Sequence, residues 1–155
     1  MLENFTYDEI SVGQTATYSK LVTDRDIRLF AAISGDVNPV HLDEDYAKTT
    51  PFKGRIAHGM ITGALVSAAL ALKLPGPGTI YLGQNLSFRK PVYIGDTLTV
   101  TLEVTEKRDD KRFIAIGCEV ANQDGKAVAT GDALVMAPSE KISMEAPPLP
   151  VVTIG

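Results

Sequence analysis

The sequence predicts an α+β fold in which an antiparallel sheet wraps around one long central helix. The stretch Met60–Leu74 is apolar or small at nearly every position, which indicates a helix buried on nearly all sides. Segments that follow it alternate apolar and polar residues, and this two-residue period is typical of half-buried strands. One buried helix beside several long strands favours a sheet that curves around that helix.

A strand and a short helix are predicted before the central helix. The strand covers Thr15–Thr23, and Thr23 or Asp24 is a suitable cap for the helix that follows. We expect this helix to stop at Gly35, because glycine readily adopts the left-handed conformation that ends helices. Further along, Asp43–Lys48 is predicted to form a short helical turn.

The second half of the chain is predicted to be mostly strands. Two prolines and two glycines in Pro75–Gly78 end the central helix. Residues 97–104 alternate between apolar and polar side chains, and Phe113–Val120 and Ala127–Met136 follow after short turns. These three segments are predicted to form an antiparallel meander.

Length and charge limit the domain organisation and the partners. The 155 residues suit one domain, which we place at residues 1–137. In residues 138–155, four prolines stand among small and charged residues, which indicates a tail or linker. The net charge of −4, with Lys and Arg scattered along the chain, argues against a nucleic-acid partner.

The single cysteine, Cys118, excludes an internal disulfide and fits a reducing compartment. The alternation in Phe113–Val120 places it on the same face as Ile114, Ile116 and Val120, so it is predicted to pack in the core. The chain does not open on a charged segment followed by an apolar stretch, and the central helix is short for a bilayer span. We therefore expect a cytoplasmic protein that does not interact with a membrane.

The segment Asp36–His41 contains a carboxylate and an imidazole, side chains that exchange protons near neutral pH. Pro39 fixes its own φ and keeps Asn38 out of the helical region, so the segment is predicted to be a tight loop and not a helical turn. Thr49–Arg55 is predicted to be an irregular cover over a pocket. Alternatively, the segment only begins a turn, with His41 as a local cap.

Gly59 stands where the central helix is predicted to begin. Its N–H belongs to the first turn, where backbone donors are unpaired and the helix dipole is positive. Such a donor can stabilise an oxygen that gains negative charge during a reaction. The alternative is that Gly59 only permits close packing of the helix.

The motifs together resemble those of the MaoC-like (R)-specific enoyl-CoA hydratases. The resemblance runs from about Val12 to about Ala137. It rests on the Asp-x-Asn-Pro-x-His segment at 36–41, on His-Gly-Met at 58–60, and on Tyr81–Phe88 with the Lys-Pro-Val and Gly-Asp sequences that follow. The resemblance implies a hot-dog fold, an antiparallel sheet wrapped around one helix, and a homodimer.

The resemblance also implies roles for individual residues. Asp36 and His41 are the catalytic pair, Asn38 shapes their loop, and Gly59 supplies the oxyanion donor. Ser67 matches a serine that supports the pair from the central helix, or it is a small packing residue.

The resemblance further implies reversible addition of water to a trans-2-enoyl-CoA, which gives an (R)-3-hydroxyacyl-CoA. The apolar face of the central helix, including Met60 and Ala64, would line the acyl tunnel, although such residues also serve close packing. Two other functions remain open, an acyl-CoA thioesterase and a non-catalytic acyl-CoA-binding module.

No cofactor is expected. The sequence contains no P-loop, dinucleotide fingerprint or metal-ligand cluster, and two histidines with one cysteine make a poor zinc set. Arg55, Arg89 and Lys90 lie near the motifs and are candidates to meet the phosphates of CoA, although solvated surface charge is the alternative for each.

Overall fold

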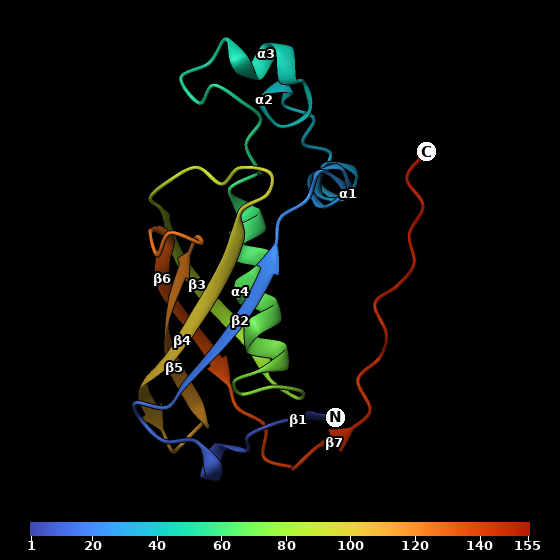
Figure 1. Ribbon diagram of the computed structural model, residues 1–155. Coiled ribbons are helices and arrows are strands. Elements are labelled where there is room, and N and C mark those ends of the chain that lie inside the picture. The colour runs from blue at the N-terminus through green and yellow to red at the C-terminus, as the bar shows by residue number, and fades with distance from the viewer.

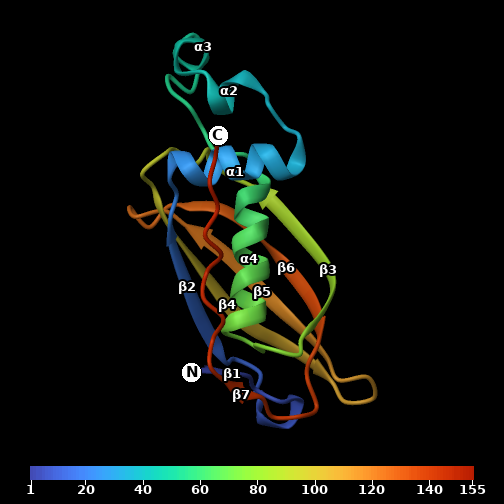
Figure 2. The same ribbon diagram turned by 90° about the vertical axis from the view of Figure 1, so that its right-hand side faces the viewer.

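The structure is a computed structural model that describes residues 1–155, and its centre is a five-stranded antiparallel sheet wrapped around helix α4 (Met60–Leu72) (Figure 1, Figure 2). The order across the sheet is β2-β4-β5-β6-β3. The strands are β2 (Thr15–Leu21), β3 (Ile80–Phe88), β4 (Thr97–Arg108), β5 (Phe113–Ala121) and β6 (Ala127–Met136). The predicted α+β hot-dog class and the β4-β5-β6 meander are confirmed.

The core lies between the concave face of the sheet and α4. Alternate residues of β4 and β5 point into it, because successive side chains of a strand face opposite sides. Cys118 is one of the buried residues on β5, as the alternation predicted. The side chains of Leu98 and Ile116 are fully buried, so the sheet is held to the helix by dispersed apolar contacts.

Helix α4 is buried on one side only. Leu65, Val66 and Leu70 face the sheet and are buried, whereas Met60 remains 57% exposed and Leu72 40% exposed. The prediction of a helix buried on nearly all sides was therefore wrong for the isolated chain. The sheet covers one face of the helix and leaves Met60 and Leu72 exposed.

Three short helices form an overhang at one end of the sheet, which we define as residues 24–58 (Figure 1). Helix α1 (Asp24–Ser34) starts at a Thr23 cap, where the Thr23 hydroxyl and the Asp26 side chain bond each other's backbone N–H. It ends at Gly35, whose φ is 78°. Burial acts to raise the pKa of Asp26, but hydrogen bonds from Thr23 and Lys20 lower it overall. The predicted cap and stop are confirmed.

Helix α2 (Pro39–Leu42) replaces the predicted tight loop, so that prediction was wrong. Asn38 remains extended and its side chain caps the helix, while Pro39 occupies the first helical position. Proline suits that position because its fixed φ is helical and its missing N–H would be unpaired there. Helix α3 (Glu44–Lys48) follows as predicted, and Thr49–Arg55 has no helix or strand.

The first residues of the chain and the segment after β6 lie at the end of the sheet opposite the overhang (Figure 1). Strand β1 (Leu2–Glu3) pairs with β7 (Ser143–Met144), and a 3₁₀ turn, η1 (Tyr7–Glu9), lies between β1 and β2. The tail then runs towards α1 on the side of the molecule where α4 lies (Figure 1, Figure 2), and Arg25 donates to the carbonyl of Val152. The domain boundary at residue 137 stays a prediction. None of the helices has the length and apolar character needed to cross a membrane.

Candidate active site

The side chains of Asp36 and His41 face each other at the base of the overhang. Asp36 Oδ2 lies 3.8 Å from His41 Nε2. His41 is 7% exposed, whereas the Asp36 side chain is 49% exposed. The end of α1 at Gly35 and the start of α2 at Pro39 bring the two residues together. The carboxylate is therefore open to solvent and the imidazole is held in the protein.

Local hydrogen bonds shape the segment between the two residues. Asp36 Oδ1 accepts the N–H of Asn38 at 3.1 Å, and Asn38 Oδ1 accepts the N–H of Val40 at 3.2 Å. Asx side chains commonly bond the backbone two residues ahead in this way. One oxygen of Asp36 is thus used to hold the backbone, which leaves the other facing His41.

The orientation of His41 is set by the backbone of the strand-like segment that precedes α4. His41 Nδ1 lies 2.8 Å from the carbonyl oxygen of Ile56. A carbonyl oxygen only accepts, so Nδ1 carries the hydrogen and the Nε2 lone pair of the neutral ring faces Asp36. The imidazole is therefore ready to accept a proton at Nε2.

Arg55 links helices α1 and α2 of the overhang. Its Nε donates to the carbonyl of His41 at 2.6 Å, and its Nη2 donates to Asp24 at 2.7 Å. Only 15% of its side chain is exposed. The sequence made Arg55 a candidate to meet a CoA phosphate or solvent. In the structure its guanidinium instead donates to the His41 carbonyl and to Asp24.

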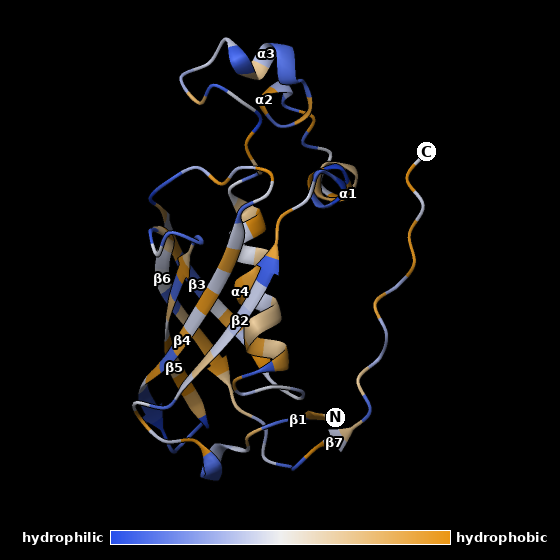
Figure 3. Cartoon of the chain, in the orientation of Figure 1, coloured by the Kyte–Doolittle hydropathy of each residue, from blue (hydrophilic) through white to orange (hydrophobic).

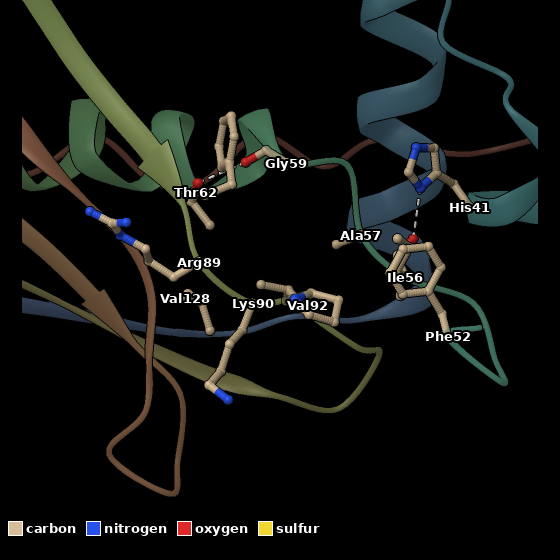
Figure 4. A pocket seen from close by; sticks show the side chains of 12 residues that line it. His41, Phe52, Ile56, Ala57, Gly59, Thr62, Arg89, Lys90, Val92 and Val128 are labelled. Carbon is tan, nitrogen blue, oxygen red and sulfur yellow. Dashed lines mark hydrogen bonds between the residues drawn. The ribbon is translucent and has the colours of Figure 1, made fainter. Parts of the chain in front are cut away.

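A cavity of about 310 Å³ opens beside His41 (Figure 4). Its lining comes from α2, from the segment before α4, from α4 itself and from the end of β3. The lining residues are His41, Phe52, Ile56, Ala57, Gly59, Thr62, Phe88, Arg89, Lys90, Pro91, Val92 and Val128. Figure 4 shows His41 on one side of the cavity and Arg89 on the other. The cavity is thus largely apolar, with cations opposite the imidazole.

Gly59 lies in this cavity at the start of α4, and its N–H makes no backbone hydrogen bond. Its φ of −53° and ψ of −41° are ordinary helical values, so the backbone does not demand glycine. A Cβ at Gly59 would lie 3.4 Å from the Phe88 ring. Glycine therefore keeps space free next to an unpaired donor.

His58 is part of the same constellation, although the sequence reasoning assigned it no role. It is 3% exposed, its Nε2 lies 3.0 Å from the Asp36 carbonyl oxygen, and its ring stacks on His41 with 3.9 Å between centroids. The signal in the sequence was its place directly before Gly59. Periodicity alone does not distinguish a buried histidine at a helix start from an apolar residue.

Comparison with known proteins agrees with this geometry. The sequence model of the MaoC like domain matches residues 9–123, which include Asp36, His41 and Gly59. The chain belongs to the MaoC-like domain family.

Proteins that are similar to this MaoC-like chain include hydratases. An (R)-specific enoyl-CoA hydratase of Rhodospirillum rubrum is 48% identical over 86% of this chain and 92% of that protein. A 3-hydroxybutyryl-CoA dehydratase of Methylorubrum extorquens is 43% identical over 92% of this chain and 88% of that protein. The structure of the R-hydratase PhaJ1 from Pseudomonas aeruginosa superposes with a TM-score of 0.95 and 56% identity, over 99% of both chains.

Three other residues singled out in the sequence lie apart from the MaoC-like cavity. Met60, Ala64 and Ser67 are four and three residues apart on α4, so they share the helix face that the sheet leaves uncovered. None of them lines the cavity that holds His41. No hydrogen bond joins Ser67 to Asp36 or His41, so the structure of one chain does not bring it to the pair.

Asp36, His41 and His58 offer ligand atoms within 4.8 Å of one another, but they do not fit a metal ion. A histidine binds a metal through an in-plane lone pair, and the rings of His41 and His58 are stacked at 27°. Their lone pairs therefore do not converge on one point. His41 Nδ1 also donates its hydrogen to the Ile56 carbonyl oxygen, so this atom has no lone pair for a metal.

Proposed function

We propose that the protein is a hydro-lyase, an (R)-specific enoyl-CoA hydratase that reversibly adds water to a trans-2-enoyl-CoA to give an (R)-3-hydroxyacyl-CoA. The observation that carries the proposal is the 3.8 Å approach of Asp36 Oδ2 to His41 Nε2 beside an apolar cavity that also exposes Gly59. Relatives with hydratase activity support the reaction and its stereochemistry.

In the proposed mechanism, one water molecule binds between Asp36 and His41. A separation of 3.8 Å is longer than a direct hydrogen bond and allows both groups to contact the same water. As the water oxygen bonds to the β-carbon, His41 Nε2 takes its proton. The proton then passes from His41 to the Asp36 carboxylate and from Asp36 to the α-carbon, so both side chains end in the protonation state in which they began. The thioester itself remains intact.

Gly59 is the proposed oxyanion donor. Negative charge develops on the thioester oxygen as water attacks, and Gly59 lines the cavity at the positive end of α4. Removal of such a donor typically costs about 3–4 kcal/mol of transition-state stabilisation. Asn38 is proposed to act indirectly, through the cap that shapes the Asp36–His41 segment.

The CoA end and the acyl end of the substrate are proposed to leave the cavity in different directions. Arg89 and Lys90 line the side away from His41 and are proposed to meet CoA phosphates. Ala64 lines a separate apolar groove of about 350 Å³ between α1 and α4, and Met60 lies at the start of that helix. We propose that Met60 and Ala64 contact long acyl chains.

We also propose that the protein forms a homodimer through the edge of β3. This strand pairs only with β6, and its free edge carries exposed Ile80, Leu82 and Phe88. An unpaired, apolar edge strand invites pairing with another chain. Size-exclusion chromatography with light scattering should give twice the chain mass of 16.6 kDa. A monomer at micromolar concentration would contradict the dimer.

The activity is tested with purified protein and crotonyl-CoA. Loss of the conjugated thioester absorbance without release of free thiol, with a product that only an (R)-specific dehydrogenase oxidises, is the expected result. Release of thiol would indicate a thioesterase instead. No reaction with crotonyl-CoA or with a longer enoyl-CoA, but binding of either, would favour a non-catalytic module.

A further inference from the structure

His58 carries a buried polar atom that the proposed reaction leaves unexplained. Its Nδ1 is the one buried side-chain nitrogen or oxygen without a hydrogen-bond partner, and the residue is 3% exposed. Burial of an unpaired polar atom opposes folding, so an apolar side chain at this position would be expected if packing were the only requirement. The contacts of the other ring atoms must therefore explain why a histidine stands at position 58.

The Nε2 atom of His58 holds Asp36. The Asp36 carbonyl oxygen, 3.0 Å away, only accepts, so Nε2 carries the hydrogen and donates it. This bond links the start of α4 to the loop after α1, 22 residues earlier in the chain. The opposite side of that loop is exposed, and the remaining bonds of Asp36 are to nearby residues of the same loop. His58 is therefore the long-range anchor of the Asp36 backbone.

The ring face of His58 holds His41. The two imidazoles stack with 3.9 Å between centroids, and Phe30 packs against His58 at 4.9 Å. His41 is thus fixed by two contacts, the Ile56 carbonyl at Nδ1 and the stacked ring of His58. The two functions use different parts of one side chain, the N–H for Asp36 and the ring face for His41.

We propose that His58 is a positioning residue that sets the distance between Asp36 and His41 and fixes both relative to the N–H of Gly59, the next residue. This inference rests on the proposed hydratase function. His58 is 3% exposed and its Nε2 is bonded to the Asp36 carbonyl oxygen, so we assign it no contact with substrate or with the reacting water. Its loss acts on kcat and leaves KM nearly unchanged, because the groups that bind CoA and the acyl chain remain in place.

Three substitutions separate the two contacts. His58→Gln places an amide N–H near the position of Nε2 and keeps the donor to Asp36. His58→Phe keeps the stacked ring and loses the donor. His58→Asn is too short for the donor and loses the ring. The matched stability control is Val100→Ala, a fully buried residue of β4 that lines none of the cavities described.

Steady-state rates with crotonyl-CoA are measured well below the melting temperature of each variant. His58→Asn is expected to lower kcat about 10²-fold, since misplacement of reacting groups by about 1 Å has an effect of that size. His58→Gln is expected to recover much of the loss, and Val100→Ala to lower the melting temperature without lowering kcat. Wild-type kcat in both His58→Asn and His58→Phe would overturn the proposal.

A crystal structure of the His58→Asn variant makes the test independent of activity. The Asp36 to His41 separation is expected to differ from 3.8 Å, or the Asp36 loop to be displaced. An unchanged pair in that crystal would overturn the positioning role even if the hydratase activity is confirmed. Conversely, a wild-type enzyme that hydrates neither crotonyl-CoA nor a longer enoyl-CoA would refute the proposed function and leave the structural result to decide the role of His58.

Discussion

Different interactions stabilise two regions of the molecule. One region is the sheet with α4, and the other is the overhang at residues 24–58. The first buries many apolar side chains spread over five strands and one helix. The second is mostly hydrophilic in Figure 3, and a small set of bonds made by Arg55, His58 and the Ile56 carbonyl fixes its internal arrangement. Burial in the first region is shared among many side chains, whereas each bond in the second region depends on a single residue. The proposed catalytic pair lies in the second region.

This difference predicts that substitutions in the overhang mainly change activity and that substitutions in the sheet mainly change stability. A change in the overhang removes one polar contact and leaves the main core intact, so it is expected to act on the reaction. A change in the sheet alters packing over several neighbours and is expected to act on folding. The four predictions that follow test this separation, beginning with the largest effect.

Substitution of the proposed catalytic pair has the largest expected effect. His41→Ala and Asp36→Asn should each lower kcat by about 10²–10⁴-fold, the usual contribution of a general acid or base. Asp36→Asn keeps an oxygen that can accept the Asn38 N–H, so the fold should be unchanged. Asp45→Asn on the exposed side of α3 is the control. Near-normal rates in both variants would refute the assignment.

Gly131→Ala tests the sheet. A Cβ at this position of β6 would lie 1.8 Å from the carbonyl oxygen of Asn85 on β3, so the two strands must move apart. Overpacking of this kind typically costs about 1–3 kcal/mol of unfolding free energy. Chemical denaturation measures the loss. Gly117→Ala is the control, because its nearest neighbour would be 3.7 Å away, and equal stability of the two variants would contradict the prediction.

Arg55→Met tests the overhang without touching the cavity. The variant keeps a long side chain but loses the bonds to the His41 carbonyl and to Asp24. We expect kcat to fall about tenfold because α2 is held less firmly, with a smaller change in melting temperature. Arg28→Met, an exposed residue of α1, should leave both values unchanged. A large loss of stability with normal kcat would show that Arg55 serves folding and not the site.

Cys118 reports on the core through its reactivity, and no change in activity is expected from it. Burial raises the pKa of its thiol from 9.0 to about 11. Only the thiolate reacts with alkylating reagents, so at pH 8 the native protein should react about 10²-fold more slowly than an unperturbed thiol. The raised pKa stabilises the fold below pH 9, and this contribution is lost as pH rises towards 11. The urea-unfolded protein is the control, and rapid native labelling would contradict the prediction.

The regular part of the fold was largely readable from the sequence. Alternation marked β4, β5 and β6, and the Thr23 cap with Gly35 gave both ends of α1. The exception near the site is α2, where Pro39 was taken as a helix breaker although it starts the helix. Local preference does not decide between these two uses of proline, because the outcome depends on whether Asn38 caps the following N–H groups.

The candidate site was only partly readable. Asp36 and His41 were assigned to one site through the family resemblance, because their spacing alone also fitted a simple turn with His41 as a local cap. His58 and Arg55 act over 22 and 14 residues, and their partners are backbone carbonyls, which no side-chain pattern reveals. Ser67 was expected near the pair, but it lies on the open face of α4.

The sequence by itself determined the α+β class, the meander, the central helix and the Asp36–His41 segment, because periodicity, caps and turn residues act over a few positions. Only the tertiary structure decided the 3.8 Å approach of the two side chains and the stacking of His58 on His41. It also decided which face of α4 is covered. Those features depend on contacts between segments far apart in the chain, and short-range preferences do not specify them.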